Sequence, residues 1–386
     1  MRTSLPTDPA LSGLRSLSDA DLARITGKGP VEVVRLRHHP GLRAALHVIC
    51  GTGNRRQQGV IWFLSPSKLS HLRETRPHLR IDPEGSAVFE AFPMDHRLPE
   101  LATFLNNSEA LAPRLIGGCA RARPELVRYR PGLSATFRWL SDGGATHFVK
   151  VARRMDSQAH ADLQNHLRLQ SEGSILALPP VTGCLADKGM IAYAAAEGES
   201  LESILAQGDT KVITQAVSQC GEALRVLWSC DAPMLPALEV DDYLRSARRA
   251  AEWIADADAA AGAQARTLIQ AREARAPSLR NVPIHADLKP DHVFAGPSRV
   301  TLIDTESLKK GDPDFDLALL DARLDLGPIT GAFSEPAVAA ARQVLRATAG
   351  PNAPWFQGLA KIHAAKFLAQ HVGPGAAEDI RRILAA

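Results

Sequence analysis

Residues 282–294 read Val282-Pro-Ile-His-Ala-Asp-Leu-Lys-Pro-Asp-His-Val-Phe, and residues 300–306 read Val300-Thr-Leu-Ile-Asp-Thr-Glu. A short apolar run leads into a loop that carries Asp287, and a second apolar run ends at Asp304, 17 residues later. A hairpin of this length brings both carboxylates to one mouth. Lys289 and His292, a cation and a candidate metal ligand, lie in the same loop. We therefore expect a polar site built around this stretch.

The loop resembles the catalytic loop of kinases, His-x-Asp-Leu-Lys-Pro-x-Asn, and Ile303-Asp304 resembles the metal-binding aspartate that follows it. Together with Gly311-Asp-Pro-Asp-Phe-Asp-Leu-Ala, it looks more closely like the aminoglycoside phosphotransferase and choline kinase-like family of small-molecule kinases. The resemblance extends with landmarks over about residues 124–322. It implies an ATP-dependent phosphotransferase with a protein-kinase-like fold. Such a reaction needs Mg²⁺ held against the phosphates and an acceptor hydroxyl in line.

Carried over residue by residue, the resemblance assigns roles to the loop and the segment after it. It makes Asp287 the catalytic base and Asp304 the principal Mg²⁺ ligand. Lys289 would reach the γ-phosphate, Asp316 would hold the loop through backbone hydrogen bonds, and His285 would be structural.

The nucleotide side of the site is expected upstream. His147-Phe-Val-Lys-Val resembles the strand whose lysine pairs with the α- and β-phosphates, which makes Lys150 the anchor. The segment from Met190 to Leu201 resembles the hinge that meets adenine, and there we assign Glu197 to cofactor binding. In the segment Arg130–Thr136, upstream of Lys150, Gly132 and Ser134 could cap phosphates through backbone and hydroxyl groups.

Three features depart from the kinase pattern. His292 stands where the family usually has asparagine as a second metal ligand, and imidazole suits Mn²⁺ better than Mg²⁺. No glutamate lies between residues 151 and 171 to pair with Lys150, so Asp162 is our choice of partner. The turn at Arg130 has no GxGxxG pattern, which argues against protein substrates.

The amino-terminal half contains an apparent repeat. The segment starting at Val33 matches the one starting at Leu126, and Val60–Leu64 would correspond to His147–Val151, with Phe63 near the place of Lys150. We predict an α+β fold in which residues 1–115 form an extra unit that duplicates the sheet lobe. An antiparallel nucleotide-binding sheet lobe over 116–197 and a helical lobe over 198–386 would follow.

Composition and hydropathy argue against nucleic-acid-binding, membrane-spanning and disulfide-linked proteins. A formal charge of +3 over 386 residues gives no global reason to expect nucleic acid as a partner. No run approaches the roughly 20 apolar residues of a membrane helix, and we expect a cytoplasmic protein. The five cysteines are scattered, so reduced thiols are expected.

The sequence leaves the acceptor and some roles open. A small-molecule hydroxyl of the aminoglycoside, amino alcohol, sugar or nucleoside class is expected, and acids near Asp321 and Asp325 would suit a cationic one. The basic run 121–130 could guide an anionic substrate or form a solvated sheet edge, and we favour the edge. His38 and His39 are expected at the surface of a turn. The amino-terminal unit would pack on the catalytic lobe or mediate a homodimer.

Two other functions compete with this one. The first is a catalytically weak, nucleotide-binding regulatory module, and the second is a metal-dependent phosphoesterase.

Overall fold

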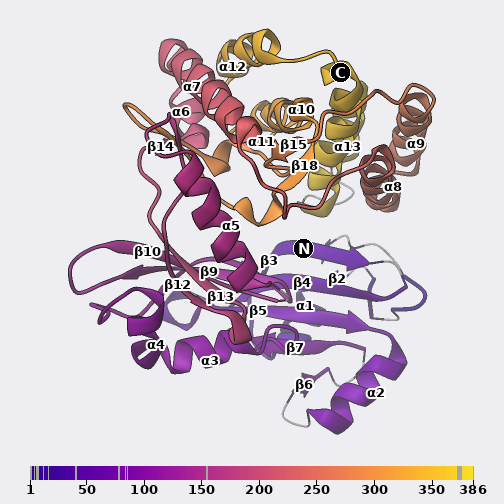
Figure 1. Cartoon of the computed structure of the whole chain (residues 1–386). Helices are drawn as coiled ribbons and strands as arrows, with labels where there is room; N and C mark the ends of the chain where they lie inside the picture. The colour runs from indigo at the N-terminus through magenta and orange to yellow at the C-terminus, as the bar shows by residue number, and fades with distance from the viewer. Residues whose placement is uncertain are drawn as a thin grey trace.

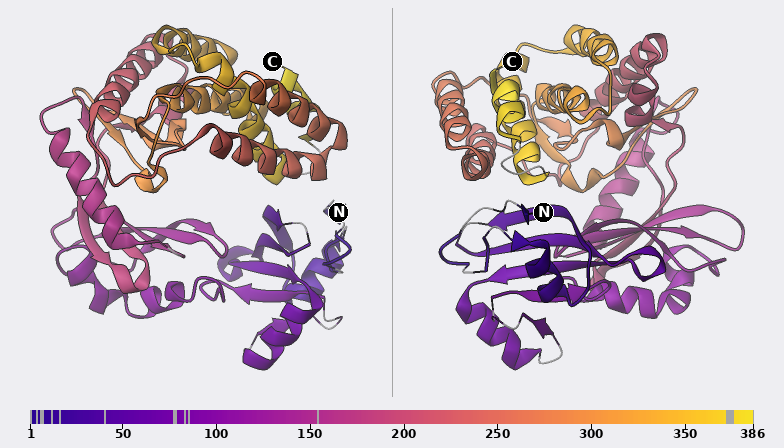
Figure 2. Two further views of the ribbon diagram at one scale, coloured as in Figure 1. Left: turned by 45° about the vertical axis from the view of Figure 1, so that its right-hand side comes forward. Right: turned by 180° about the vertical axis from the view of Figure 1, so that it is seen from behind.

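Two antiparallel sheets lie side by side and face a helical lobe (Figures 1 and 2). This computed structural model describes residues 2, 3, 5, 8–11, 13–15, 17–39, 41–76, 79–82, 84, 86–153, 155–371 and 376–385. Within these ranges no helix is both long and apolar enough to span a membrane. The predicted α+β, two-lobed fold with an additional amino-terminal unit is confirmed.

The first sheet belongs to the amino-terminal unit and has the strand order β3-β4-β5-β7-β6. Its strands are β3 (Val31–His39), β4 (Arg43–Cys50), β5 (Gln57–Leu64), β6 (Arg80–Ile81) and β7 (Val88–Ala91), and β1 (Arg2–Thr3) pairs separately with β2 (Leu17–Ser18). Side chains alternate between its faces, so α1 (Asp19–Thr26) packs through Leu22 on one core. Leu69 of α2 (Pro66–Thr75) joins a second core with Trp62.

The second sheet has the order β12-β13-β10-β9-β8. Its strands are β8 (Glu125–Arg130), β9 (Ser134–Leu140), β10 (Thr146–Ala152), β12 (Val181–Leu185) and β13 (Met190–Ala194), with α5 (Ser157–Gln170) between β10 and β12. The helices α3 (Glu100–Asn106) and α4 (Ser108–Leu115) were assigned to the amino-terminal unit. They pack instead in the core of this sheet, where Phe104 meets Phe137 and Trp139.

The two sheets have matching topology. Each is a three-stranded meander followed by a helix and by two further strands, of which the last inserts beside the third. Each also has a register shift at the same place in its first pair, between Val33 and Arg35 in β3 and between Leu126 and Arg128 in β8. Two independent features thus agree with the predicted repeat.

The strand registers correct one detail of that repeat. Arg35 pairs with His47, which pairs with Val60, while Arg128 pairs with Thr136, which pairs with Lys150. Val60, rather than the predicted Phe63, therefore occupies the position of Lys150. The sequence alignment slipped because the first hairpin has longer strands in the first copy: Arg35 and its partner His47 are 12 positions apart, but Arg128 and Thr136 are only 8 apart. The expectation that this copy has no anchoring lysine is unaffected.

The helical lobe contains two large apolar cores. Its helices are α6 (Leu201–Gln207), α7 (Thr210–Ser229), α8 (Val240–Ala257), α9 (Ala259–Glu273), α10 (Pro313–Leu324), α11 (Leu326–Thr330), α12 (Glu335–Thr348), α13 (Ala353–His371) and α14 (Ala377–Ala385). Its short strands are β11 (Leu176–Ala177), β14 (Glu199–Ser200), β15 (Val282–Ile284), β16 (Val293–Ala295), β17 (Val300–Leu302) and β18 (Lys309–Gly311). Residues 282–306, quoted above, thus contain β15, β16 and β17.

The amino-terminal unit contacts both other parts of the chain. A buried polar network joins the sheets: Asp95 accepts from Tyr129 Oη at 2.9 Å and from Gly132 N at 2.6 Å. At the end of β3, His38 Nε2 lies 2.8 Å from Asp8 and its Nδ1 lies 3.5 Å from Asp256 of α8. The prediction of a surface histidine there was wrong, since His38 is buried between the unit and the helical lobe.

Candidate active site

The catalytic-loop candidate is fixed by a buried carboxylate beneath it. Asp316, on α10, accepts hydrogen bonds from His285 N and Ala286 N, both at 2.8 Å, as predicted. Ala286 has φ 61°, a left-handed conformation that costs energy in a residue with a side chain. The His285 ring is fully buried, and its Nε2 donates to Ile303 O at 2.9 Å. Burial lowers the pKa of His285 to about 4, so this ring is neutral and structural at pH 7.

Three candidate ligands converge at the mouth of the hairpin. Ligand atoms of Asp287, His292 and Asp304 all lie within 4.8 Å of one another. His292 is buried, and its ring nitrogens have no hydrogen-bond partner among the described residues, although Nε2 lies 3.3 Å from Asp304 Oδ2. Buried polar atoms without a partner are costly, so this donor set fits a bound divalent cation. Asp304 itself is in the left-handed region, with φ 60°.

Lys150 comes from the central strand of the second sheet and reaches this cluster. Its Nζ lies 2.6 Å from Asp304 Oδ1 and 2.9 Å from Glu306 Oε1. Burial alone would raise the pKa of Asp304. The His292 ring and Lys150 outweigh burial and hold this pKa well below its usual range. Burial raises the pKa of Glu306, and the neighbouring Asp304 adds to this.

The acidic partner of Lys150 differs from the predicted one. Asp162 is exposed on α5 and accepts from Gln158 Nε2 at 2.9 Å. The expected pairing is therefore wrong, and Glu306 takes that role with Asp304. Helix α5 instead contacts the same turn through Gln164 Oε1, which accepts from Thr305 Oγ1 at 2.6 Å.

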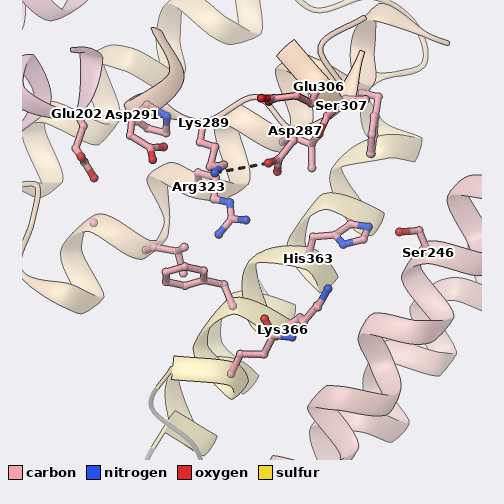
Figure 3. Close-up of a pocket in the computed structure, with 18 of the residues that line it drawn as sticks. Glu202, Ser246, Asp287, Lys289, Asp291, Glu306, Ser307, Arg323, His363 and Lys366 are labelled. Carbon is pink, nitrogen blue, oxygen red and sulfur yellow. Dashed lines mark ion pairs between the residues drawn. The ribbon is translucent and has the colours of Figure 1, made fainter. Parts of the chain in front are cut away.

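Two cavities meet at this cluster. The hinge cavity, of ≈ 510 Å³, is lined by Lys150, Ser134, Ala194–Ala196, His292 and Asp304. The front cavity, of ≈ 780 Å³, is lined by Asp287 and Lys289 and by side chains of the helical lobe (Figure 3). Lys289 Nζ lies 3.5 Å from Asp287 Oδ2. Asp291 and Glu306 line both spaces, so a molecule in one cavity can meet a molecule in the other.

Some predicted binding residues are placed differently. The Glu197 side chain is exposed and does not line the hinge cavity, because the chain turns away after Ala196 and Glu197 O accepts from Thr301 Oγ1 at 3.3 Å. The Gly132 N–H is donated to Asp95, so it cannot cap a phosphate.

The two acids that the sequence suggested as partners of a cationic acceptor are already paired with an arginine. Asp321 Oδ1 and Asp325 Oδ1 each lie 2.6 Å from Arg342. Neither lines the front cavity.

Sequence reasoning also missed residues that converge only in the fold. Glu306 lay within the quoted stretch but was passed over, because its partner lysine was expected to pair with a helix. Arg323, His363 and Lys366 of α10 and α13 point into the front cavity (Figure 3). No local pattern marks these three, and only tertiary packing brings them together.

Solved structures share this architecture. The apo form of a thermostable mutant of an aminoglycoside phosphotransferase matches with a TM-score of 0.52 and 14% identity, covering 72% of this chain and 96% of that one. Its ternary complex with AMP-PNP and hygromycin B matches with a TM-score of 0.51 and 14% identity, covering 72% and 95%. At this identity the likeness concerns the fold. No functionally curated protein matches the sequence.

The sequence itself matches a family profile over more than half its length. The profile of the phosphotransferase enzyme family covers residues 125–351, from the first strand of the second sheet to the end of α12 and the turn after it. That range includes Lys150, the whole hairpin and Asp316. The chain therefore belongs to the phosphotransferase enzyme family.

Proposed function

We propose that this protein transfers the γ-phosphoryl group of ATP to a hydroxyl group of a small molecule. The observation that carries the proposal is the cluster of Asp287, His292 and Asp304 at the junction of two cavities, with Lys150 bound to Asp304. One cavity suits the nucleotide and the other the acceptor, so the reacting groups would meet at the cluster. The family match supports this reaction class.

The nucleotide would occupy the hinge cavity. Its adenine would lie against the backbone of Ala194–Ala196, and Lys150 would pair with the α- and β-phosphates. Ser134 lines the same cavity and would offer its hydroxyl to the phosphates. Asp304 and His292 would hold Mg²⁺ or Mn²⁺, which neutralises phosphate charge when bound.

The acceptor hydroxyl would approach Asp287 from the front cavity. Its oxygen forms a bond to the γ-phosphorus while the bond from that phosphorus to the β–γ bridging oxygen breaks. The hydroxyl proton passes to an Asp287 oxygen, and ADP leaves with the bridging oxygen. Lys289, 3.5 Å from Asp287, would balance charge on the transferred group.

A nucleotide-release assay against a broad hydroxyl-bearing library, with mass detection of the products, tests the proposal. We expect ADP release that depends on one acceptor class, with a phosphoryl group added to that acceptor. Nucleotide binding without acceptor-dependent turnover would indicate a regulatory module instead. Hydrolysis of phosphate esters without ATP would indicate a phosphoesterase.

A further inference from the structure

The front cavity concentrates positive charge. Besides Lys289 and Lys309, five cations from three parts of the chain line it: Arg35 of β3, Arg128 and Arg130 of β8, Arg323 of α10 and Lys366 of α13. None of the five forms an ion pair with an acid among the described residues. Cations that have no ion-pair partner and line one cavity attract an anionic ligand.

Four of these cations are partly buried, and Arg128 is exposed. Burial, and then the neighbouring Arg130, Arg128 and Arg323, lower the pKa of Arg35 to about 10. Burial and the charge of Arg323 also lower the pKa of Lys366. The buried Nε atoms of Arg35 and Arg130 have no hydrogen-bond partner. Like charges held together with unpaired donors are unfavourable, so anionic oxygens in this space would be bound favourably.

The acids that line the same cavity offset these cations only in part: Asp287 and Asp291 act on Arg323, but burial still holds the pKa of Arg323 below its usual value. Asp242 accepts from Arg245 at 2.9 Å, Glu306 binds Lys150 and Asp287 lies beside Lys289. The two remaining acids, Glu202 and Asp291, lie together near Lys289 and away from Lys366 (Figure 3). Lys366 therefore lies away from these two acids, whereas Arg323 lies close to Lys289 and Asp291 (Figure 3).

Three of the five cations lie outside the space assigned to the nucleotide. Arg128 and Arg130 line both cavities and could serve ATP phosphates. Arg35, Arg323 and Lys366 line the front cavity but not the hinge cavity, so their charge acts on whatever occupies the front cavity. Arg35 also borders a small pocket of ≈ 20 Å³.

Resting on the phosphotransfer proposed above, we propose that the acceptor is a hydroxyl compound carrying an oxyanion group, a phosphate or a carboxylate, bound by Arg35, Arg323 and Lys366. Guanidinium groups bind both oxyanions through paired N–H donors. His363 lies beside Lys366 and would border the bound molecule (Figure 3). This reverses the cationic acceptor suggested by the sequence. It also gives the basic run 121–130 a role at the site through Arg128 and Arg130.

The amino-terminal unit completes this acceptor site. Arg35 occupies in the first sheet the position that Arg128 occupies in the second, as the strand registers require. The contact of His38 with Asp256 and the ring contact of His39 with Trp253, at 5.3 Å, hold β3 against α8. The repeated sheet therefore supplies a wall of the front cavity and one of its cations.

Matched acceptors test the charge preference. Glucose, glucosamine, glucose 6-phosphate and glucuronate share one pyranose ring, and each of the last three differs from glucose at one substituent. They are compared by kcat/KM for ADP release beside the library. We expect the highest values for acceptors with a phosphate or a carboxylate, and the better of the two identifies the oxyanion. Higher values for neutral or cationic acceptors would overturn the inference while leaving phosphotransfer intact.

Variants test the assigned residues. In Arg35→Gln and Arg323→Gln, we expect KM for the anionic acceptor to rise about tenfold or more, with KM for ATP unchanged. Arg35→Lys should restore part of the loss. Arg346→Gln, an exposed arginine on α12 outside both cavities, is the matched control. Equal KM values in wild type and both variants would contradict the assignment.

A binding measurement tests the anion site without any need for turnover. Inorganic phosphate is titrated calorimetrically with ADP and Mg²⁺ saturating the nucleotide site. We expect binding that Arg35→Gln weakens about tenfold and Arg346→Gln leaves unchanged. If phosphate binding depends on Arg35 but no acceptor stimulates ATP consumption, the proposed function is refuted and the anion site is retained. Phosphate binding that is absent, or equal in all variants, would overturn the anion site.

Discussion

Lys150 Nζ lies 2.6 Å from Asp304 Oδ1, although 154 residues separate them in the chain. The contact joins the central strand of the second sheet to the hairpin of the helical lobe. Glu306 Oε1, 2.9 Å from the same nitrogen, completes a half-buried triad. This arrangement places a cation where it can exchange one carboxylate for phosphate oxygens.

Replacing Lys150 by Met should therefore weaken nucleotide binding. The variant loses the phosphate contact and leaves the carboxylates of Asp304 and Glu306 facing each other without a cation. We expect KM for ATP to rise about tenfold or more in steady-state assays. Lys188→Met, on the same lobe, should retain the wild-type value. An unchanged KM in Lys150→Met would mean that this lysine does not meet the nucleotide.

His292→Asn tests the metal preference. Asparagine offers a hard oxygen in place of an imidazole nitrogen, and hard oxygen donors suit Mg²⁺ while imidazole suits Mn²⁺. We expect the ratio of activity with Mn²⁺ to activity with Mg²⁺ to fall several-fold, measured by ADP release at saturating metal. The same ratio in wild type and variant would show that His292 is not a ligand.

Asp316→Ala should destabilise the protein. The substitution leaves the buried N–H groups of His285 and Ala286 without acceptors and releases the left-handed conformation of Ala286. We expect a loss of roughly 3 kcal/mol in the free energy of unfolding, measured with urea, together with reduced kcat. Asp187→Ala, at an exposed site, is the control. Equal stability of both variants would contradict the role of Asp316.

The contact of His38 with Asp8 and Asp256 should make stability depend on pH. Burial opposes the charge of His38, but Asp256 and Asp8 outweigh it and raise the pKa of His38 above 6.5. Its contribution is therefore full below pH 6.5 and is lost as the pH rises through the raised value. We expect His38→Gln to reduce the free energy of unfolding more at pH 6 than at pH 9. The exposed control His71→Gln should show no such difference, and a pH-independent effect of His38→Gln would contradict the ion pair.

The sequence predicted the parts of the site that lie close together in the chain. Asp287, His292 and Asp304 occupy one hairpin, so short spacing was enough to expect their approach. The repeat of the sheet lobe was also readable, because strand alternation and the Arg-x-Arg pattern recur at 35–37 and 128–130.

The remaining parts depend on long-range packing. Glu306 was missed because the partner of Lys150 was expected from a helix, and α5 offers Gln164 there instead. The Phe63 correspondence failed because register is set by hydrogen-bonded pairs rather than by resemblance. Arg35, Arg323 and Lys366 come from three elements with no shared pattern, so only the fold reveals that they line one cavity.

The most direct test follows the phosphoryl group itself. ATP labelled with ¹⁸O in its γ-phosphoryl group is incubated with the acceptor and with either wild-type protein or Asp287→Asn, and the acceptor mass is measured. We predict a labelled phosphoryl group on the acceptor with wild type and a rate at least about a hundredfold lower in the variant, with ATP binding retained. Label appearing only in inorganic phosphate, or equal rates in both proteins, would contradict acceptor phosphorylation assisted by Asp287.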